Sequence, residues 1–417
     1  MNIFKDRFSE IKKASEPLYK SPKSVQETIE ILKISEGGIF EVADGKYSKT
    51  YRFSDVNYAT RSEDEQESFF QRYCKCLNSF DCTFKITVNN KNKDMDVLRN
   101  EVMLKYRNDG FDKMRESYNR IIEDKILEGR QGIEQERYLT ITIERKNFEE
   151  AKAQFATIEA SMFRSFAELG SKLTPLTGNE RLKILHDYYR LGREDEFNFD
   201  IRQGRITGTD FRNEICNTRI KYHPDYFENE GKVGRVLFIK KYPTYLSDRF
   251  FTELTFLPVH SVTSVDVVPV PKDLTMKMLQ KKYLGIESDI IKQQRTRNRN
   301  NDFSSDISYA TRQKKKDIEE IMNNVRENDE SLYYVSVTMI VMADDRDELE
   351  SICETVDSIT KGAGCAVDTC MYKQREAVNT TLPIGVRQIE TMRTMLTQSL
   401  AVLMPFNVQE RATRFAV

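Results

Sequence analysis

Histidine is scarce in this 417-residue sequence. The three histidines are His186, His223 and His260, and they lie far apart. Their spacing fits neither a zinc-ligand pattern nor a catalytic triad, and Gly-x-Ser-x-Gly and His-Glu-x-x-His motifs are absent. We therefore predict structural roles for all three histidines and expect no catalysis by this chain alone.

A phosphate-binding loop is also missing. The segments Gly231–Gly234 and Gly362–Gly364 lack the spacing of such a loop, and the Lys-Ser/Thr pair that would meet phosphate and magnesium is absent. They are typical of turn glycines. We expect no cofactor in this chain, and we expect it neither to bind nor to hydrolyse ATP.

Long apolar runs are absent as well. No stretch of eighteen apolar residues occurs, and the sequence after Met1 does not read as a signal peptide, so we predict neither a transmembrane segment nor export. The seven cysteines show no pairing pattern. Cys74, Cys76 and Cys82 form the one tight group, with no histidine nearby, which favours reduced thiols over a zinc site.

What the sequence does contain is a clear strand–helix–strand pattern from Leu332 to Met371. Apolar residues alternate with others up to Val341, which indicates a strand. Asp344 or Asp345 can then cap a helix with apolar residues at helical spacing. Glycines at 362 and 364 end the helix, and a second strand follows from Cys365.

The same pattern recurs about two hundred residues earlier. A strand is predicted over Glu136–Ile143, a helix capped by Asn147 follows and ends at Gly170, and Ser171–Pro175 is a short closing strand. Each pattern is preceded by another strand–helix–strand order. The segments are a hairpin at Asp44-Gly45, a helix from Ser62, a strand at Cys82–Val88, a strand at Arg235–Ile239, a helix at Tyr245–Leu254 and a strand at Ser264–Val270.

Two such patterns in series predict an α+β protein with two ferredoxin-like (βαβ-βαβ) units. Each unit carries a long helical insertion, one over about Asp94–Glu128 with an interruption near Asp109-Gly110, and one over Leu274–Val325. The predicted organisation is a flexible tail at 1–35, a first unit at 36–176, a connector at 177–232 with a helix at Glu180–Tyr189, a second unit at 233–372 with a helical arm at 272–331, and a C-terminal helix within 373–417.

The arm is basic in a protein whose net charge is −1. Residues 272–316 hold twelve Lys and Arg against five Asp and Glu, a net charge of +7. One interpretation is an arm that faces phosphate or acidic lipid; the other is a solvated helical hairpin whose charges face water. The candidate contact residues, all expected to be exposed, are Arg295, Arg297, Arg299, Lys314, Lys315 and Lys316.

Several stretches resemble a known family. They are Lys241–Leu246 with its short aromatic helix, the arm segment Lys281–Arg295, the strand Tyr333–Val341 with Asp345–Leu349 after it, and the apolar helix and Pro-Phe of Met395–Phe406. Their order resembles the N-terminal region of the VirB/TraE-type (TraC-like) ATPases of conjugative type IV secretion systems, in the form found on integrative elements of Gram-positive bacteria.

The resemblance implies a scaffold and assembly module of a conjugative DNA-transfer ATPase, cytoplasmic and peripherally associated with the membrane. Implied partners are the inner-membrane transfer-complex proteins and the ATPase domain, with a hexamer at full length. That family continues past Pro405-Phe406 into a RecA-like motor with both Walker motifs, whereas this sequence reaches Val417. We therefore expect ATP and Mg to bind only a missing motor domain, on a longer protein or a separate chain.

The alternative is a nucleic-acid-binding module that uses the arm at 272–316. Against it, the predicted strands show no aromatic RNA-binding signature, and the basic tip has no aromatic residue before Phe303.

Overall fold

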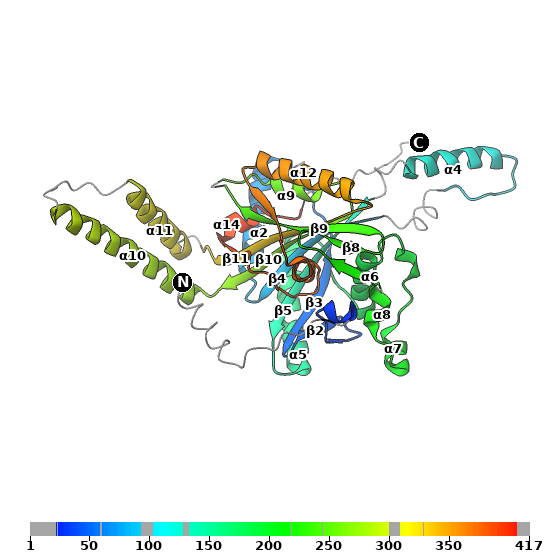
Figure 1. Cartoon of the computed structure of the whole chain (residues 1–417), viewed down its shortest axis with the longest axis horizontal. Coiled ribbons are helices and arrows are strands. Elements are labelled where there is room, and N and C mark those ends of the chain that lie inside the picture. Colours follow the sequence, from blue (N-terminus) through cyan, green and yellow to red (C-terminus); the bar gives the residue numbers. More distant parts are fainter. Residues whose placement is uncertain are drawn as a thin grey trace.

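The computed structural model describes residues 22, 24–58, 61–92, 103–127, 133–217, 219–243, 245–299, 309–327 and 329–406. One antiparallel sheet of thirteen strands runs through the molecule, with helices packed on it and helical arms projecting at two opposite sides (Figure 1). The chain is thus an α+β protein, as predicted.

The main path of the sheet has the order β1-β2-β3-β5-β4-β10-β11-β9-β8-β7, with β6 on β3, β12 on β9 and β13 on β11. The strands are β1 (Lys33–Ile34), β2 (Ile39–Ala43), β3 (Lys46–Phe53), β4 (Thr83–Asn92), β5 (Ile133–Glu144), β6 (Leu173–Pro175), β7 (Ile220–Tyr222), β8 (Phe227–Asn229), β9 (Lys232–Lys241), β10 (Ser261–Val270), β11 (Leu332–Ala343), β12 (Ala366–Thr369) and β13 (Arg393–Leu396).

The helices connect these strands and cover the sheet. They are η1 (Gln26–Thr28), α2 (Glu63–Asn78), α4 (Asp112–Leu127), α5 (Phe148–Leu169), α6 (Gly178–Tyr189), η2 (Glu194–Glu196), α7 (Ile201–Thr207), α8 (Phe211–Ile215), α9 (Arg249–Thr255), α10 (Lys272–Arg299), α11 (Tyr309–Glu327), α12 (Arg346–Gly362), α13 (Gln374–Thr381) and α14 (Thr397–Ala401).

The two halves of the chain repeat one strand order. The first half gives β6-β3-β5-β4 and the second half gives β12-β9-β11-β10. Tyr138 on β5 and Tyr334 on β11 therefore lie on strands that occupy equivalent places. The halves are joined where β4 pairs with β10, with Ile86 opposite Val265, so that both belong to one sheet. The sequence analysis did not predict this joining.

The central strands are buried on both faces. On β11, Met339 and Val341 belong to a core with α2, α5, α9, α12 and α14, whereas Ile340 and Met342 belong to a core with α6 and α13 on the other face. A strand buried on both sides needs no polar alternation, which explains the nearly continuous apolar run of β11.

Capping residues and a glycine in the sequence predicted correctly where these helices begin and end. Ser62 begins α2 with a capping box, and the side chains of Asn147 and Asp345 accept from backbone amides at the starts of α5 and α12. Gly170 ends α5 with a φ of 80°, a left-handed conformation that glycine adopts without strain. These predicted boundaries are confirmed.

Three helix predictions were wrong in extent. In the insertion expected over Asp94–Glu128, the interruption near Asp109-Gly110 is confirmed, and α4 begins at Asp112. The part before it was predicted wrongly, because residues 103–108 are not helical; residues 93–102 and 128 lie outside the described part. The helix expected at Tyr245 begins at Arg249. The C-terminal helix is the five-residue α14, because residues 393–396 instead form β13 against the part of β11 that β9 leaves free.

The segment from Thr380 to Gln388, here called the strap, crosses the sheet on the α6 and α13 side. Its backbone carbonyls accept hydrogen bonds from hydroxyl groups of the sheet. Ser48 and Thr50 of β3 donate to Ile384 and Pro383 at 2.5 Å and 3.2 Å. On β5 and β10 the corresponding donors are Thr142, to Gly385 at 3.1 Å, and Ser264, to Thr381. The strap thus bonds to both halves.

Gly385 is the tightest point of the strap. Its φ is 94°, and an added Cβ would lie 2.5 Å from Cβ of Ser48 and 2.7 Å from Oγ1 of Thr142. We predict that Gly385→Ala lowers the free energy of unfolding by about 2–4 kcal/mol, through backbone strain and overpacking. Gly285→Ala in α10 is the matched control, since its Cβ meets nothing within 4 Å. Urea unfolding should show no loss for this control, and equal losses for the two would contradict the prediction.

Candidate functional site

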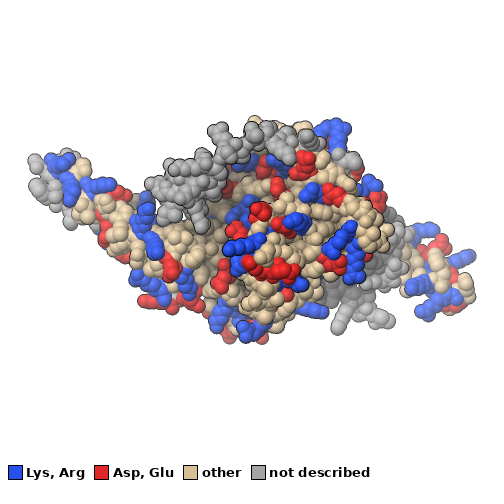
Figure 2. Space-filling model, turned by 90° about the horizontal axis from the view of Figure 1, so that it is seen from below, with Lys and Arg blue, Asp and Glu red and all other residues tan. Residues whose placement is uncertain are grey.

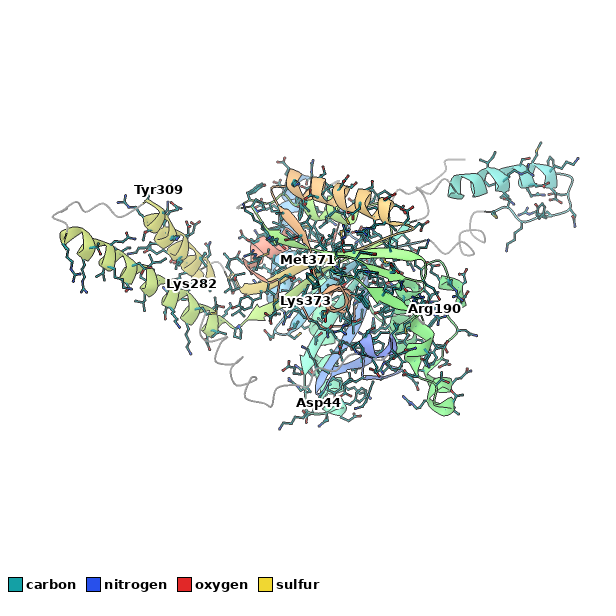
Figure 3. All side chains as sticks on the ribbon, in the orientation of Figure 1. Asp44, Arg190, Lys282, Tyr309, Met371 and Lys373 are labelled. Atoms are coloured by element: carbon teal, nitrogen blue, oxygen red, sulfur yellow. The ribbon has the colours of Figure 1, made fainter. Side chains whose placement is uncertain are left out.

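The predicted arm is a pair of helices, α10 and α11, that projects from the sheet (Figure 3). Leu279 and Val325 are buried at its base. Farther out, the Lys315 ammonium pairs with Glu287 at 3.2 Å and lies 5.1 Å from the ring centre of Tyr283. The two helices therefore contact each other along the arm, and Tyr309 begins α11 at its distal end.

The structure spreads the six candidate cations along the arm. Arg295, Arg299, Lys314 and Lys316 are exposed, Lys315 is half-buried, and the side chain of Arg297 lies outside the described residues. Lys315 lies level with Glu287. Arg295 is eight residues farther along α10, a rise of about 12 Å. The candidates thus share one arm but not one cluster.

Lys315 differs from its neighbours because it holds the helices together. Hydrogen bonds to Tyr283 and to Glu287 raise the pKa of Lys315 above its ordinary value. A side chain engaged in this way is a structural contact of the arm. Lys314 and Lys316 remain available to an outside ligand.

Charge is distributed unevenly along the arm. No acidic residue occurs from Ile290 to Arg299 or from Tyr309 to Lys316, whereas Asp317, Glu319 and Glu320 follow directly toward the body. Figure 2 shows Lys and Arg gathered at the far end of the arm. The distal arm can therefore attract anions although the whole protein is nearly neutral.

The first half carries its own projecting helix, α4, which sequence reasoning treated only as charged. Four large apolar side chains are exposed on it and the residue before it: Phe111, Met114, Tyr118 and Ile121 are 60%, 70%, 39% and 55% exposed. Their spacing of three, four and three residues puts them on one helix face. That spacing is visible in the sequence and could have revealed the exposed face.

Two buried cations lie beneath the strap. The Lys85 ammonium of β4 donates to the carbonyls of Thr380 and Val386, the latter at 3.0 Å. Arg181 of α6 donates to the carbonyls of Gly38 and Ser48, both at 2.9 Å, and to those of Pro383 and Ile384 at 3.3 Å. Burial lowers the pKa of both side chains.

These cations bind the chain's own backbone, which makes them structural. The sequence analysis did not single them out, because a lone Lys in an alternating strand gives no sign of which segment will cover it. The residue opposite Lys85 on the neighbouring strand β10 is Asp266, which is also buried. The pair lies at the junction of the two halves.

Several further reactive groups are buried. Burial raises the pKa of the Cys74 and Cys76 thiols to about 12 and lowers that of His260 to about 4. Within the described ranges, no cluster of three or more His, Cys, Asp or Glu could hold a metal ion. None of the described helices is long and apolar enough to cross a membrane.

Comparison with protein-family models found no match, and comparison with curated proteins found none either.

Lys85 supplies a pH-dependent test of the junction. We predict that Lys85→Met lowers the free energy of unfolding by about 3 kcal/mol at pH 7, because Asp266 and the strap carbonyls lose their partner. Burial lowers the folded-state pKa of Lys85 to about 8. The unfolded chain therefore binds this proton more tightly between about pH 8 and 10.5, so Lys85 makes the free energy of unfolding rise with pH in that window.

The difference in stability between wild type and Lys85→Met should accordingly widen by about 2 kcal/mol from pH 8 to pH 10. Urea titrations of both proteins at the two pH values measure it. The same series on Lys316→Met, an exposed lysine, should show no widening. A constant difference would mean that folding does not lower the pKa of Lys85.

Proposed function

We propose that this chain is a non-catalytic scaffold module that docks a conjugative type IV secretion ATPase onto its membrane-bound transfer machinery. In this proposal the two repeated strand orders are two ferredoxin-like units, and the nucleotide site belongs to a motor domain outside this sequence. The module helps to govern assembly, in a hexamer when the motor is attached.

The observation that carries this proposal is the combination of one rigid platform with projecting helices. A sheet buried on both faces cannot easily deform, because close-packed cores resist local rearrangement. The helices α4, α10 and α11 extend from that sheet with exposed apolar or basic side chains. Rigid platforms with exposed extensions are suited to holding partners at fixed positions.

The basic end of α10 and α11 supports peripheral contact with the membrane. Acidic lipid of the cytoplasmic leaflet attracts clustered cations with about 1 kcal/mol for each Lys or Arg near the surface. Arg295 and Arg299 are exposed at the arm's distal end, with no acid on the same stretch of helix. Inner-membrane transfer proteins would then be the partners within reach.

A second candidate function is nucleic-acid binding by the same arm. The acid-free helical stretches at 290–299 and 309–316 favour it, because phosphate contacts by Lys and Arg need no aromatic platform on duplex DNA. The two candidates differ in their preferred anion, so one pair of measurements distinguishes them.

We predict that replacing Arg295, Arg297 and Arg299 together by Ser weakens association with acidic vesicles by roughly 3 kcal/mol at low salt, since three cations leave the surface. Flotation with vesicles of one part phosphatidylserine to two parts phosphatidylcholine measures this association. Fluorescence anisotropy with duplex and single-stranded DNA over a salt series measures the alternative. The melting temperature should stay nearly unchanged.

The matched control replaces Lys105, Lys113 and Arg120 by Ser. Lys113 and Arg120 lie on α4 and Lys105 in the segment before it; all three are exposed, and both signs of charge occur there. The control should bind vesicles as the wild type does. DNA binding lost in the Arg triple variant, with no vesicle binding by wild type, would favour the second function. Early unfolding of the triple variant would assign those arginines a structural role.

A further inference from the structure

A groove of about 640 Å³ lies beside β13, between the end of β9 and helix α11 of the arm. Its walls are residues 241–243, 245 and 246, strand β13 and helix α14, with Phe70 of α2 and Ile321 of α11 at the sides. It thus lies between the body of the protein and the base of the arm. We call it the β13 groove.

The groove exists because two strands share one edge of β11. Strand β9 pairs with β11 only as far as Phe238, opposite Thr338. Strand β13 then takes over and pairs with residues 332–335. Among the described residues, no strand pairs with the other edge of β13. A free strand edge presents unpaired backbone groups that an extended peptide can satisfy.

The charged groups lining the groove are all positive. They are Lys241 and Arg393, both exposed, and no carboxylate is among the described lining residues. The Arg393 guanidinium donates to the carbonyl of Lys240 at 2.6 Å, which holds it at the rim. An occupant with a carboxylate would complement this rim.

Tyr242 adds a polar group without a partner. Its hydroxyl is buried and makes no hydrogen bond within the described structure, although buried hydroxyls are normally bonded. Burial raises the pKa of Tyr242, so the hydroxyl stays protonated and can donate. The oxygen has almost no surface open to solvent, so it belongs to the packing behind the groove wall and is not a contact for an occupant.

The rest of the lining is largely apolar. Met395, Leu396 and Leu246 contribute aliphatic surface, and Tyr245, at 84% exposed, contributes an aromatic ring. A volume of this size is within the range of ordinary ligand sites. It suits several residues of an extended chain with apolar side chains on one face.

We propose that the β13 groove binds an extended segment of a partner protein, which adds as a strand to β13 and carries apolar side chains next to a carboxylate. The free edge selects an extended backbone, the lining selects the apolar side chains, and Lys241 with Arg393 selects the acidic residue. This inference rests on the proposed docking function and names the chemistry of its partner.

A fluorescein-labelled hexapeptide, Asp-Val-Thr-Leu-Glu-Val with blocked ends, is the probe. Fluorescence anisotropy with the whole chain should saturate below about 1 mM. Two control peptides test the chemistry: one with Lys in place of both acids, and one with Pro in place of Thr, which cannot pair as a central strand residue. Both should bind at least tenfold more weakly.

Two variants test the location. Arg393→Glu should weaken the probe at least tenfold, whereas Arg299→Glu on the distal arm should not, although both arginines are exposed.

No saturation with any peptide, or binding that Arg393→Glu leaves unchanged, would overturn the proposal. Self-association of the chain that Arg393→Glu abolishes would also overturn it, by assigning the groove to a second copy.

The peptide-binding measurement contains no vesicles or DNA. Probe binding without vesicle association would therefore uphold the groove and refute the membrane-docking function, and the reverse result would refute the groove alone.

Discussion

Hydrogen bonds from the sheet to the strap are the constraint on which the rest of the structure depends. Hydroxyl groups of β3, β5 and β10 and the ammonium of Lys85 lie on a buried face, where an unpaired donor costs about 1–3 kcal/mol each. The middle of a helix could not satisfy them, because its carbonyls are engaged within the helix. The carbonyls of Thr380 and Thr381, in the last turn of α13, and those of the irregular residues that follow it are free of helix bonds and accept these donors. The two halves are therefore coupled by a segment that belongs to neither repeated strand order.

The buried cations follow from the same arrangement. Arg181 directs its guanidinium at four backbone carbonyls and lies 3.8 Å from the ring centre of Phe40. Carbonyl dipoles and an aromatic face thus replace the water that a charge loses on burial. The arm cations have the opposite environment, exposed and with few acids nearby. The buried cations of the body thus bind the chain's own backbone, whereas most cations of the arm, with Lys315 as an exception, face solvent.

How far the sequence predicted the fold depended on whether a signal was local. The caps at Ser62, Asn147 and Asp345 and the turn at Asp44-Gly45 act over a few residues, and the strands and helices beside them were predicted correctly. The pairing of β4 with β10, the strap and β13 depend on residues far apart in the chain, and no local pattern indicated them. At Met395, an apolar run suited both a helix and a strand, and the free edge of β11 decided between them. For the candidate site, exposure of the charged arm followed from composition, whereas the partner of Lys315 did not.

The antiparallel pairing of β4 with β10 determines where the two insertions leave the sheet. The first insertion follows the end of β4 and the second follows the end of β10, and Asn90 lies opposite Ser261, so the end of one strand lies beside the start of the other. The insertions therefore leave the sheet at opposite ends, separated by a ten-residue strand, roughly 30 Å. The basic arm and the exposed apolar side chains of α4 therefore lie at opposite ends of the molecule (Figure 1). A partner of the arm and a partner of α4 can bind at the same time without competing for space.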